Sequence, residues 1–304
     1  MNNFILLIAC FVIGMLLRRS GRLPANAHAA FNGFVIHISL PALTLLFVHA
    51  LRIELRLLFP IAMAWVMFVV GFFTFRAAGR LFALPRATVG ALILTGSLAN
   101  TSFIGLPMIE TYYGAPGLGL GILIDQMGTY LVLSTLGLVV AALYGHGAGI
   151  TVWSVARRLL TFAPFLALVA AVLLIPVRYP AWFETLLQRL GATLVPLALV
   201  SVGYQIQWSA VHGKLRELGM GLAFKLVLGP AIVAALFVGL FGARGETIQI
   251  TIFEAAMAPQ IGAAIVAVDH DLDPALVTLM VGIGIPLSFV TVPLWWYVLK
   301  PLAP

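Results

Sequence analysis

Long apolar stretches separated by short polar gaps run along the whole chain. A stretch of roughly 20 apolar residues can cross the hydrocarbon core of a bilayer as a helix. On this criterion the sequence predicts ten membrane spans, at about residues 3–18, 30–50, 57–78, 87–112, 118–144, 158–176, 182–206, 218–241, 246–268 and 274–299. The first stretch is the shortest, so a re-entrant segment is the alternative there. The pattern therefore predicts an all-α polytopic membrane protein.

Several residues recur at a spacing of about half the chain. The separations are between 152 and 155 residues, and the pairs are Pro41 with Pro196, Pro107 with Pro259, Gly128 with Gly282, and Ser134 with Ser288. Because five is an odd number, a second copy of five spans would enter the membrane upside down relative to the first. We therefore expect two inverted five-helix repeats, at residues 1–145 and 157–304, joined by a short cytoplasmic linker at 146–156. The alternative is that the prolines coincide by chance.

The composition supports a membrane environment. Of the 304 residues, 62% are hydrophobic and only 9% are charged, whereas a soluble domain carries about 25% charged residues. So few charges cannot cover a water-facing surface, and the lipid bilayer is the expected surrounding. The net charge of +7 does not suggest nucleic-acid binding, because the basic residues occupy short gaps between apolar runs instead of a solvated face with aromatic side chains.

The distribution of basic residues predicts the orientation of the chain. Alternate gaps hold ten Lys and Arg residues on one side and six on the other. The richer side should be cytoplasmic, which places both termini on the outer, periplasmic side of a bacterial inner membrane. The first apolar run has no Lys or Arg before it and three Arg soon after it, so it is expected to be a mature span and not a signal peptide. A single cysteine, Cys10, excludes a disulfide within the chain.

A proline lies near mid-membrane depth in the fourth and ninth predicted spans. Proline removes a helix hydrogen bond, so both helices should break, at Pro107 and at Pro259. Asn100 and Thr101 beside one break, and Gln260 beside the other, can bind the backbone groups that are freed. Each proline suits the first turn of a new half-helix, whose N-terminus carries partial positive charge. Two such positive ends would attract negative charge, which predicts a site for a small organic anion. The alternative is that each proline only kinks a helix that packs against its neighbours.

Ionisable groups at membrane depth are costly unless they are paired or wetted, so each is a functional candidate. Asp125 and Glu254 lie deepest, and either could carry a coupling proton. Lys225 either snorkels to the cytoplasmic rim or attracts an anion. Residues expected at a rim or in packing contacts, with no role assigned, are Glu110, His37 and His49.

These residues lie in motifs that resemble the auxin efflux carrier family, the bacterial relatives of the plant auxin exporters. The resemblance runs nearly end to end. Its most specific parts are Asn-Thr-x-Phe-Ile-Gly-Leu-Pro at 100–107, Ala-Met-Ala-Pro-Gln at 256–260, and Lys225 five residues before Pro230. It implies a ten-span fold like that of sodium/proton antiporters and bile-acid symporters, in which broken helices 4 and 9 cross. Together with the residue analysis, it predicts a substrate site formed by Asn100, Thr101, Pro107, Pro259, Gln260, Thr44 and Asp125.

The resemblance also narrows the function. Bacterial relatives are associated with malate, malonate and similar acids. Asp125 stands where the plant exporters have glutamine, which argues against auxin itself. We therefore expect a carrier of a small carboxylate that works by alternating access, either coupled to H+ or Na+ or driven by the membrane potential, with dimers common in the family. A sodium-coupled symporter, a channel and a receptor are the alternatives. No enzyme, metal or cofactor is expected, since the sequence holds neither His-Glu-x-x-His nor Gly-x-Ser-x-Gly.

Overall fold

The computed structural model describes residues 2–51, 54–145, 151–206 and 214–302. In these ranges every regular element is helical, and the one β-type pairing is an antiparallel bridge between Ala99 and Pro259. Helices long and apolar enough to cross a membrane are Ala27–Val48, Leu55–Leu81, Ala115–Tyr144, Ala181–Gln205, Leu215–Leu240 and Pro274–Leu302. A further span is formed if Val155–Thr161 and Ala163–Leu173, which meet at a bend of 67°, are counted together. The predicted class, an all-α polytopic membrane protein, is confirmed.

The chain forms two compact units that interleave along the sequence. Unit 1 comprises residues 1–54, 102–126 and 157–206, and unit 2 comprises residues 55–101, 127–156 and 207–304. Each unit therefore takes residues from both halves of the sequence. Elements that continue from the residues of one unit into those of the other are η4 (Thr101–Gly105), η6 (Ile124–Tyr130) and α9 (Val152–Thr161).

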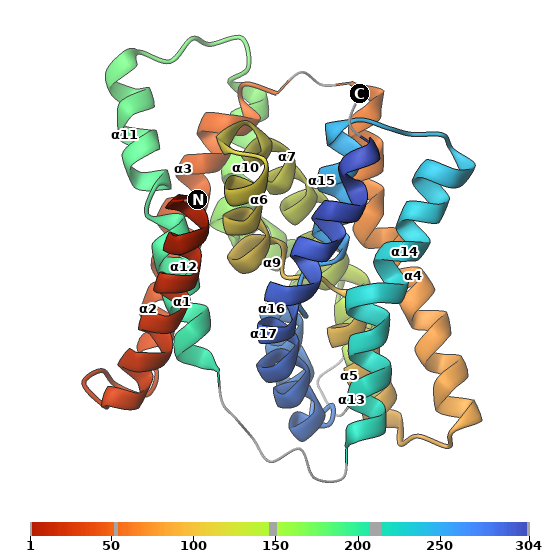
Figure 1. Cartoon of the computed structure of the whole chain (residues 1–304). Helices are drawn as coiled ribbons and strands as arrows, with labels where there is room; N and C mark the ends of the chain where they lie inside the picture. Colours follow the sequence, from red (N-terminus) through yellow and green to blue (C-terminus); the bar gives the residue numbers. More distant parts are fainter. Residues whose placement is uncertain (1, 52–53, 146–150, 207–213, 303–304) are drawn as a thin grey trace. The chain divides into compact units, whose positions relative to one another are not determined.

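Unit 1 is organised around a close pair of helices. Its elements are α1 (Asn2–Ser20), α2 (Ala27–Phe34), η1 (Val35–Ser39), α3 (Leu40–Leu43), η2 (Thr44–Val48), α6 (Leu106–Tyr112), η5 (Ala115–Gly117), α7 (Leu118–Leu123), α10 (Ala163–Leu173), α11 (Ala181–Gly191) and α12 (Leu194–Gln205). Helices α1 and α12 lie side by side (Figure 1). A Cβ atom at Gly14 would lie 2.2 Å from the carbonyl oxygen of Val200, and one at Gly203 would lie 2.1 Å from that of Phe11. Small residues thus bring the two backbones into direct contact, which is a common basis of helix association in membranes.

Unit 2 contains the two short helices whose ends meet at the bridge. Its elements are η3 (Leu55–Leu57), α4 (Leu58–Leu81), α5 (Arg86–Ser97), η7 (Leu133–Gly137), α8 (Leu138–Tyr144), α13 (Leu215–Ala223), η8 (Phe224–Leu228), α14 (Gly229–Ala234), η9 (Ala235–Leu240), α15 (Glu246–Ala255), α16 (Ile261–Asp269), α17 (Pro274–Leu299) and η10 (Lys300–Leu302). Large apolar side chains face outward, including Phe73 at 64%, Leu240 at 72% and Val290 at 61% exposure. Such a surface suits contact with lipid.

Asp273 joins three helices at one end of unit 2. It precedes α17 with a left-handed backbone (φ 44°), and its carboxylate accepts the backbone N–H of Leu276 at 3.3 Å. The same carboxylate accepts the hydroxyl of Thr88, in α5, at 2.6 Å and the ammonium of Lys214, beside α13, at 2.7 Å. Burial acts to raise the pKa of Asp273, but the hydrogen bonds from Lys214, Thr88 and Leu276 outweigh it and lower the pKa below its usual value.

Candidate functional site

Two interrupted helices pair with each other in unit 2, at a place that we call the crossing. Helix α5 ends at Ser97 and α15 ends at Ala255, and each is followed by a short extended segment before the chain becomes helical again. The two segments pair antiparallel: the N–H of Asn100 donates to the carbonyl of Ala258 at 2.8 Å, and the N–H of Gln260 donates to the carbonyl of Leu98 at 3.1 Å. The crossing therefore satisfies backbone groups that would otherwise be orphaned inside the protein.

The predicted breaks are present, but one lies at a different residue. The first interruption covers residues 98–100, and Pro107 lies further on, in the second position of α6. The predicted break at Pro107 is therefore wrong, although Pro107 does lie in the first turn of α6. Pro259 does lie in the second interruption, but it is two residues before α16 begins at Ile261 and so is not in the first turn of that helix as predicted. At the crossing, the residue opposite Pro259 is Ala99 and not Pro107, so the two prolines do not hold equivalent places.

Pro107 is accommodated by a wider turn instead of a break. Five-residue π-type turns each end two residues before a proline, and the pairs are η1 with Pro41, η4 with Pro107, and η8 with Pro230. A proline ring in a regular helix strikes the carbonyl four residues earlier. A π-type turn widens the helix at that point, which moves this carbonyl away from the ring. The prolines of these three spans thus mark wide turns.

Polar side chains gather where the two segments pair. Asn100 is buried at 2% exposure and Thr101 is fully buried. Gln260 stands at the N-cap position of α16, yet no side chain caps that helix end. Its Oε1 atom is buried and finds no hydrogen-bond partner within the part of the chain that the structure describes. A pocket at this point would offer amide donors and acceptors together with the uncapped N–H groups of α16.

Close packing from α17 supports the crossing. A Cβ atom at Gly284 would lie 2.7 Å from Cδ of Pro259 and 2.9 Å from Cδ2 of Leu222. Because glycine has no side chain, α17 can approach the interrupted segment directly. The position of Pro259, and of Gln260 beside it, is thereby fixed by a neighbouring helix.

Two of the predicted ionisable residues meet in unit 2. Glu254 and Lys225 are both fully buried and interact electrostatically. The Nζ atom of Lys225 donates to the carbonyl oxygen of Ala255 at 2.6 Å. Because Lys225 is inside unit 2, the alternative in which it snorkels to the rim is wrong. Glu254 is enclosed in unit 2, and its depth in the membrane stays a prediction.

Asp125 and Thr44 belong to a polar cluster in unit 1. Asp125 is buried at 2% exposure and accepts the hydroxyl of Ser102 at 2.5 Å. Thr44 donates to the carbonyl of Leu40 at 2.7 Å and accepts the amide Nε2 of Gln126 at 2.8 Å. Gln126 is fully buried and was not among the predicted site residues, although its place next to Asp125 in an apolar span could have marked it.

Three ionisable residues had no role assigned: His49, His37 and Glu110. Nε2 of His49 is hydrogen-bonded to two backbone carbonyls, at 2.9 and 2.8 Å, and its ring stacks on Tyr179 at 4.1 Å. The expectation that His49 is packed is therefore confirmed. His37 is exposed and Glu110 is half-buried.

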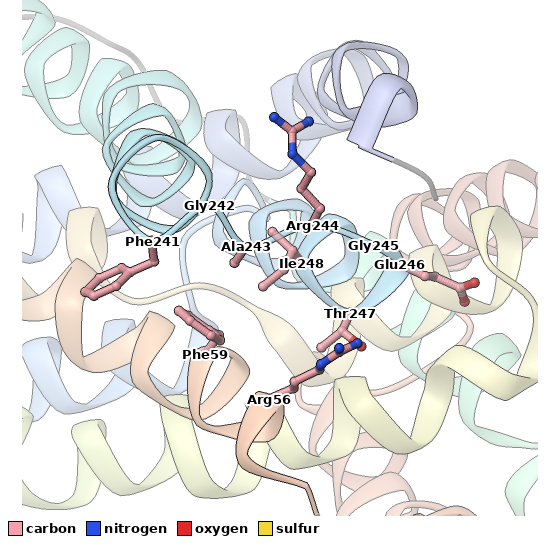
Figure 2. Close-up of a pocket in the computed structure, with 10 residues that line it drawn as sticks. All are labelled: Arg56, Phe59, Phe241, Gly242, Ala243, Arg244, Gly245, Glu246, Thr247 and Ile248. Carbon is pink, nitrogen blue, oxygen red and sulfur yellow. The ribbon is translucent and has the colours of Figure 1, made fainter.

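A separate cavity of about 630 Å³ opens at the N-terminal end of α15 (Figure 2). It is lined by residues 241–248 together with Arg56 and Phe59. The rings of Phe59 and Phe241 meet edge to face at 5.9 Å, while Arg244 extends away from them (Figure 2). None of the predicted site residues is among those that line it, so the crossing and this cavity are different places in unit 2.

The long apolar helices are those of a polytopic membrane protein. The sequence profile of the family described as "Membrane transport protein" matches residues 1–151 and 146–296. The chain belongs to this family, the auxin efflux carriers, as its motifs predicted.

Relatives of nearly the same length carry the same class of name. The chain is 26% identical over 295 residues to an uncharacterized transporter of Methanothermobacter thermautotrophicus, covering 95% of this chain and 94% of the relative. It is 22% identical over 308 residues to the uncharacterized transporter MJ1031 of Methanocaldococcus jannaschii, with 98% of both chains covered. It is also 22% identical over 320 residues to the uncharacterized transporter YfdV of Escherichia coli, covering 96% of this chain and 95% of the relative. Their names give a class, transporter, and no substrate.

Proposed function

We propose that this chain is a secondary active or potential-driven transporter of a small organic anion, which it holds where the fourth and ninth spans cross. The observation that carries the proposal is the pairing of two interrupted helices beside Asn100, Thr101, Pro259 and Gln260. Interrupted helices in secondary carriers form the substrate site, with half-helix N-termini directed at anionic groups. The uncapped start of α16, with the amide of Gln260 beside it, fits that arrangement.

The proposed ligand is a carboxylate such as malate or malonate, or an auxin-like acid. A carboxylate accepts hydrogen bonds with both oxygens, and the side-chain amides of Asn100 and Gln260 carry N–H donors. Charge-assisted hydrogen bonds of this kind are about twice as strong as neutral ones. For Thr44, Pro107 and Asp125, which belong to unit 1, a role in substrate binding stays a prediction from the family resemblance.

The proposed architecture has ten spans in two inverted repeats. The six candidate spans and the bent pair give seven spans. Helix α1, the interrupted pair α5 and α6, and the interrupted pair α15 and α16 would bring the number to ten. The crossing supports an inverted repeat, because each partner follows the order helix, extended segment, helix, and the two segments run antiparallel. The two stretches matched by the family profile overlap at residues 146–151, within the predicted linker 146–156.

Coupling and orientation complete the proposal. Asp125 or Glu254 would carry a proton in a proton-coupled cycle, since both are buried. Sodium coupling is the alternative, and a channel or receptor is the less favoured class. We further propose a bacterial inner-membrane protein with both termini on the periplasmic side, able to form a homodimer, and without enzymatic activity.

Anion flux tests the site. In proteoliposomes, uptake of a labelled dicarboxylate should fall at least about tenfold for Asn100→Ala and for Gln260→Ala, because a hydrogen bond to a charged group is worth about 1.5–3 kcal/mol. Gln249→Ala is the matched control: it removes a buried amide from α15 whose Nε2 donates to the carbonyl of Leu299 at 2.9 Å. Flux that persists in both crossing variants would reject this site assignment.

A further inference from the structure

Lys225 is an ammonium group buried beside an interrupted helix. It lies in η8, in the middle of the helical span Leu215–Leu240, and none of its surface is exposed. Its Nζ atom donates to the carbonyl of Ala255, the last residue of α15, and Glu254 next to that residue interacts with it electrostatically. Taking charged groups out of water costs several kcal/mol per ion, so an ammonium and a carboxylate that are both buried in one unit call for a functional explanation.

The carbonyl that Lys225 binds is the one left over at the end of α15. The last four carbonyls of a helix have no partner within it. Here the carbonyls of residues 252–254 accept the N–H groups of Ala256 and Met257, each at 3.2 Å. The carbonyl of Ala255 is the remaining one, and it accepts the Lys225 ammonium at 2.6 Å. The lysine thus supplies a positive charge at the negative end of the half-helix.

Neighbouring contacts hold the lysine in this place. The ring of Phe224 packs edge to face on Phe75 at 5.1 Å. The carbonyl of Leu226 accepts the indole N–H of Trp295 at 2.8 Å. These contacts fix the residues on both sides of Lys225 within the wide turn η8. The Lys225 side chain is therefore held toward the end of α15.

This end of a half-helix is where a coupled carrier would bind a cation. In carriers with interrupted helices, half-helix C-terminal ends and unwound backbone carbonyls coordinate Na+ or H+. We propose that the Lys225 ammonium is a built-in cation that occupies this place, so that the C-terminal end of α15 takes no sodium. The inference rests on the proposed function and deepens it, since it removes sodium coupling at the crossing.

Substitution of Lys225 should turn the place into a sodium site. An ammonium and a sodium ion carry the same charge and compete for the same oxygen atoms. Lys225→Ala leaves the carboxylate of Glu254 and the carbonyl of Ala255 without their internal cation. The carbonyl oxygen of Ala255, with the negative charge of the neighbouring residue Glu254, then suits Na+.

Thermal unfolding of the purified full chain in detergent tests this inference. Midpoints are compared in NaCl and in KCl at equal ionic strength. The unsubstituted protein should unfold at the same temperature in both salts. Lys225→Ala should be stabilised by NaCl, by about 3 °C for each tenfold excess of free Na+ over its dissociation constant. Adding Glu254→Gln to Lys225→Ala should abolish this gain.

Three results would overturn the inference. The first is specific stabilisation of the unsubstituted protein by Na+ that Glu254→Gln removes. The second is a folded Lys225→Ala variant that responds equally to both salts. If Lys225→Ala does not fold, Lys225→Met takes its place, because methionine keeps the side-chain volume without the charge. The third result is an equal response of Lys225→Met to both salts. These experiments measure ion binding and not anion flux. Their outcome therefore does not depend on whether Asn100→Ala and Gln260→Ala lose anion transport.

Discussion

Asp273 is a single carboxylate on which three helices of unit 2 depend. It ends the turn before α17, and its partners Thr88 and Lys214 come from α5 and from the residue before α13. An aspartate in an unfolded chain has a pKa of about 3.9, and the pKa of Asp273 in the folded chain is lower. The ionised carboxylate therefore stabilises the fold fully above about pH 4, and this contribution is lost as the pH falls through the lowered pKa.

We predict that Asp273→Asn lowers stability in a pH-dependent way. At pH 7 the variant should lose about 1 kcal/mol, because the pair with Lys214 is partly exposed and screened by solvent. The difference in unfolding midpoint between the two proteins should stay constant from pH 7 to about pH 4, and it should narrow as the pH falls further through the lowered pKa of Asp273. Asp269→Asn, at an exposed position, is the control and should show no such difference. A gap that stays constant below about pH 4 as well would contradict the role given to the ionised carboxylate.

At the level of single residues, the sequence identified the polar side chains of the crossing but not the backbone geometry around them. Asn100 and Gln260 stood out as polar residues in apolar spans, and both lie at the crossing. The place of the first break could not be predicted from local signals. Residues 98–100 hold neither proline nor glycine, and α5 ends there because the segment pairs with residues 258–260. That hydrogen bonding comes from a part of the chain about 160 residues away.

At the level of elements, proline had two different effects. Pro259 lies in an extended segment, whereas Pro107 and Pro230 follow π-type turns inside continuous helices. The sequence shows a proline in each case, and only the tertiary partners decide between the two outcomes. A proline can be met by a break or by a wider turn, and both satisfy its steric demand. Proline position alone therefore predicts an irregularity, not its form.

The contact between α1 and α12 gives a prediction for helix packing. Gly203→Ala would place a methyl group 2.1 Å from the carbonyl oxygen of Phe11, which the two helices can relieve only by moving apart. The expected loss is about 1–3 kcal/mol, measured as a lower unfolding midpoint. Gly33→Ala, in α2, is the matched control, since a Cβ atom there meets nothing within 4 Å. Equal midpoints for Gly203→Ala and the unsubstituted protein would show that this close approach is not required.

At the level of the whole molecule, the sequence predicted the class of protein and its family, and both are confirmed. The compact units could not be predicted in the same way. The repeat argument divides the chain once, near residue 152, whereas contacts gather residues 102–126 with residues 157–206. Apolar periodicity specifies which residues avoid water, but it does not specify which helices become neighbours. The inverted repeat therefore remains a prediction, supported by the antiparallel crossing.

The central claim is that the crossing binds a small organic anion, and ligand-induced stabilisation measures this most directly. The purified protein would be heated with each of several small carboxylic acids and with the uncharged amide of the same shape. A ligand that binds only the folded state raises the unfolding midpoint by mass action. We predict that at least one dicarboxylate raises the midpoint, that its amide does not, and that Asn100→Ala and Gln260→Ala lose the effect while Gln249→Ala keeps it. Equal stabilisation by acid and amide, or an effect of the acid that survives in both crossing variants, would contradict the account.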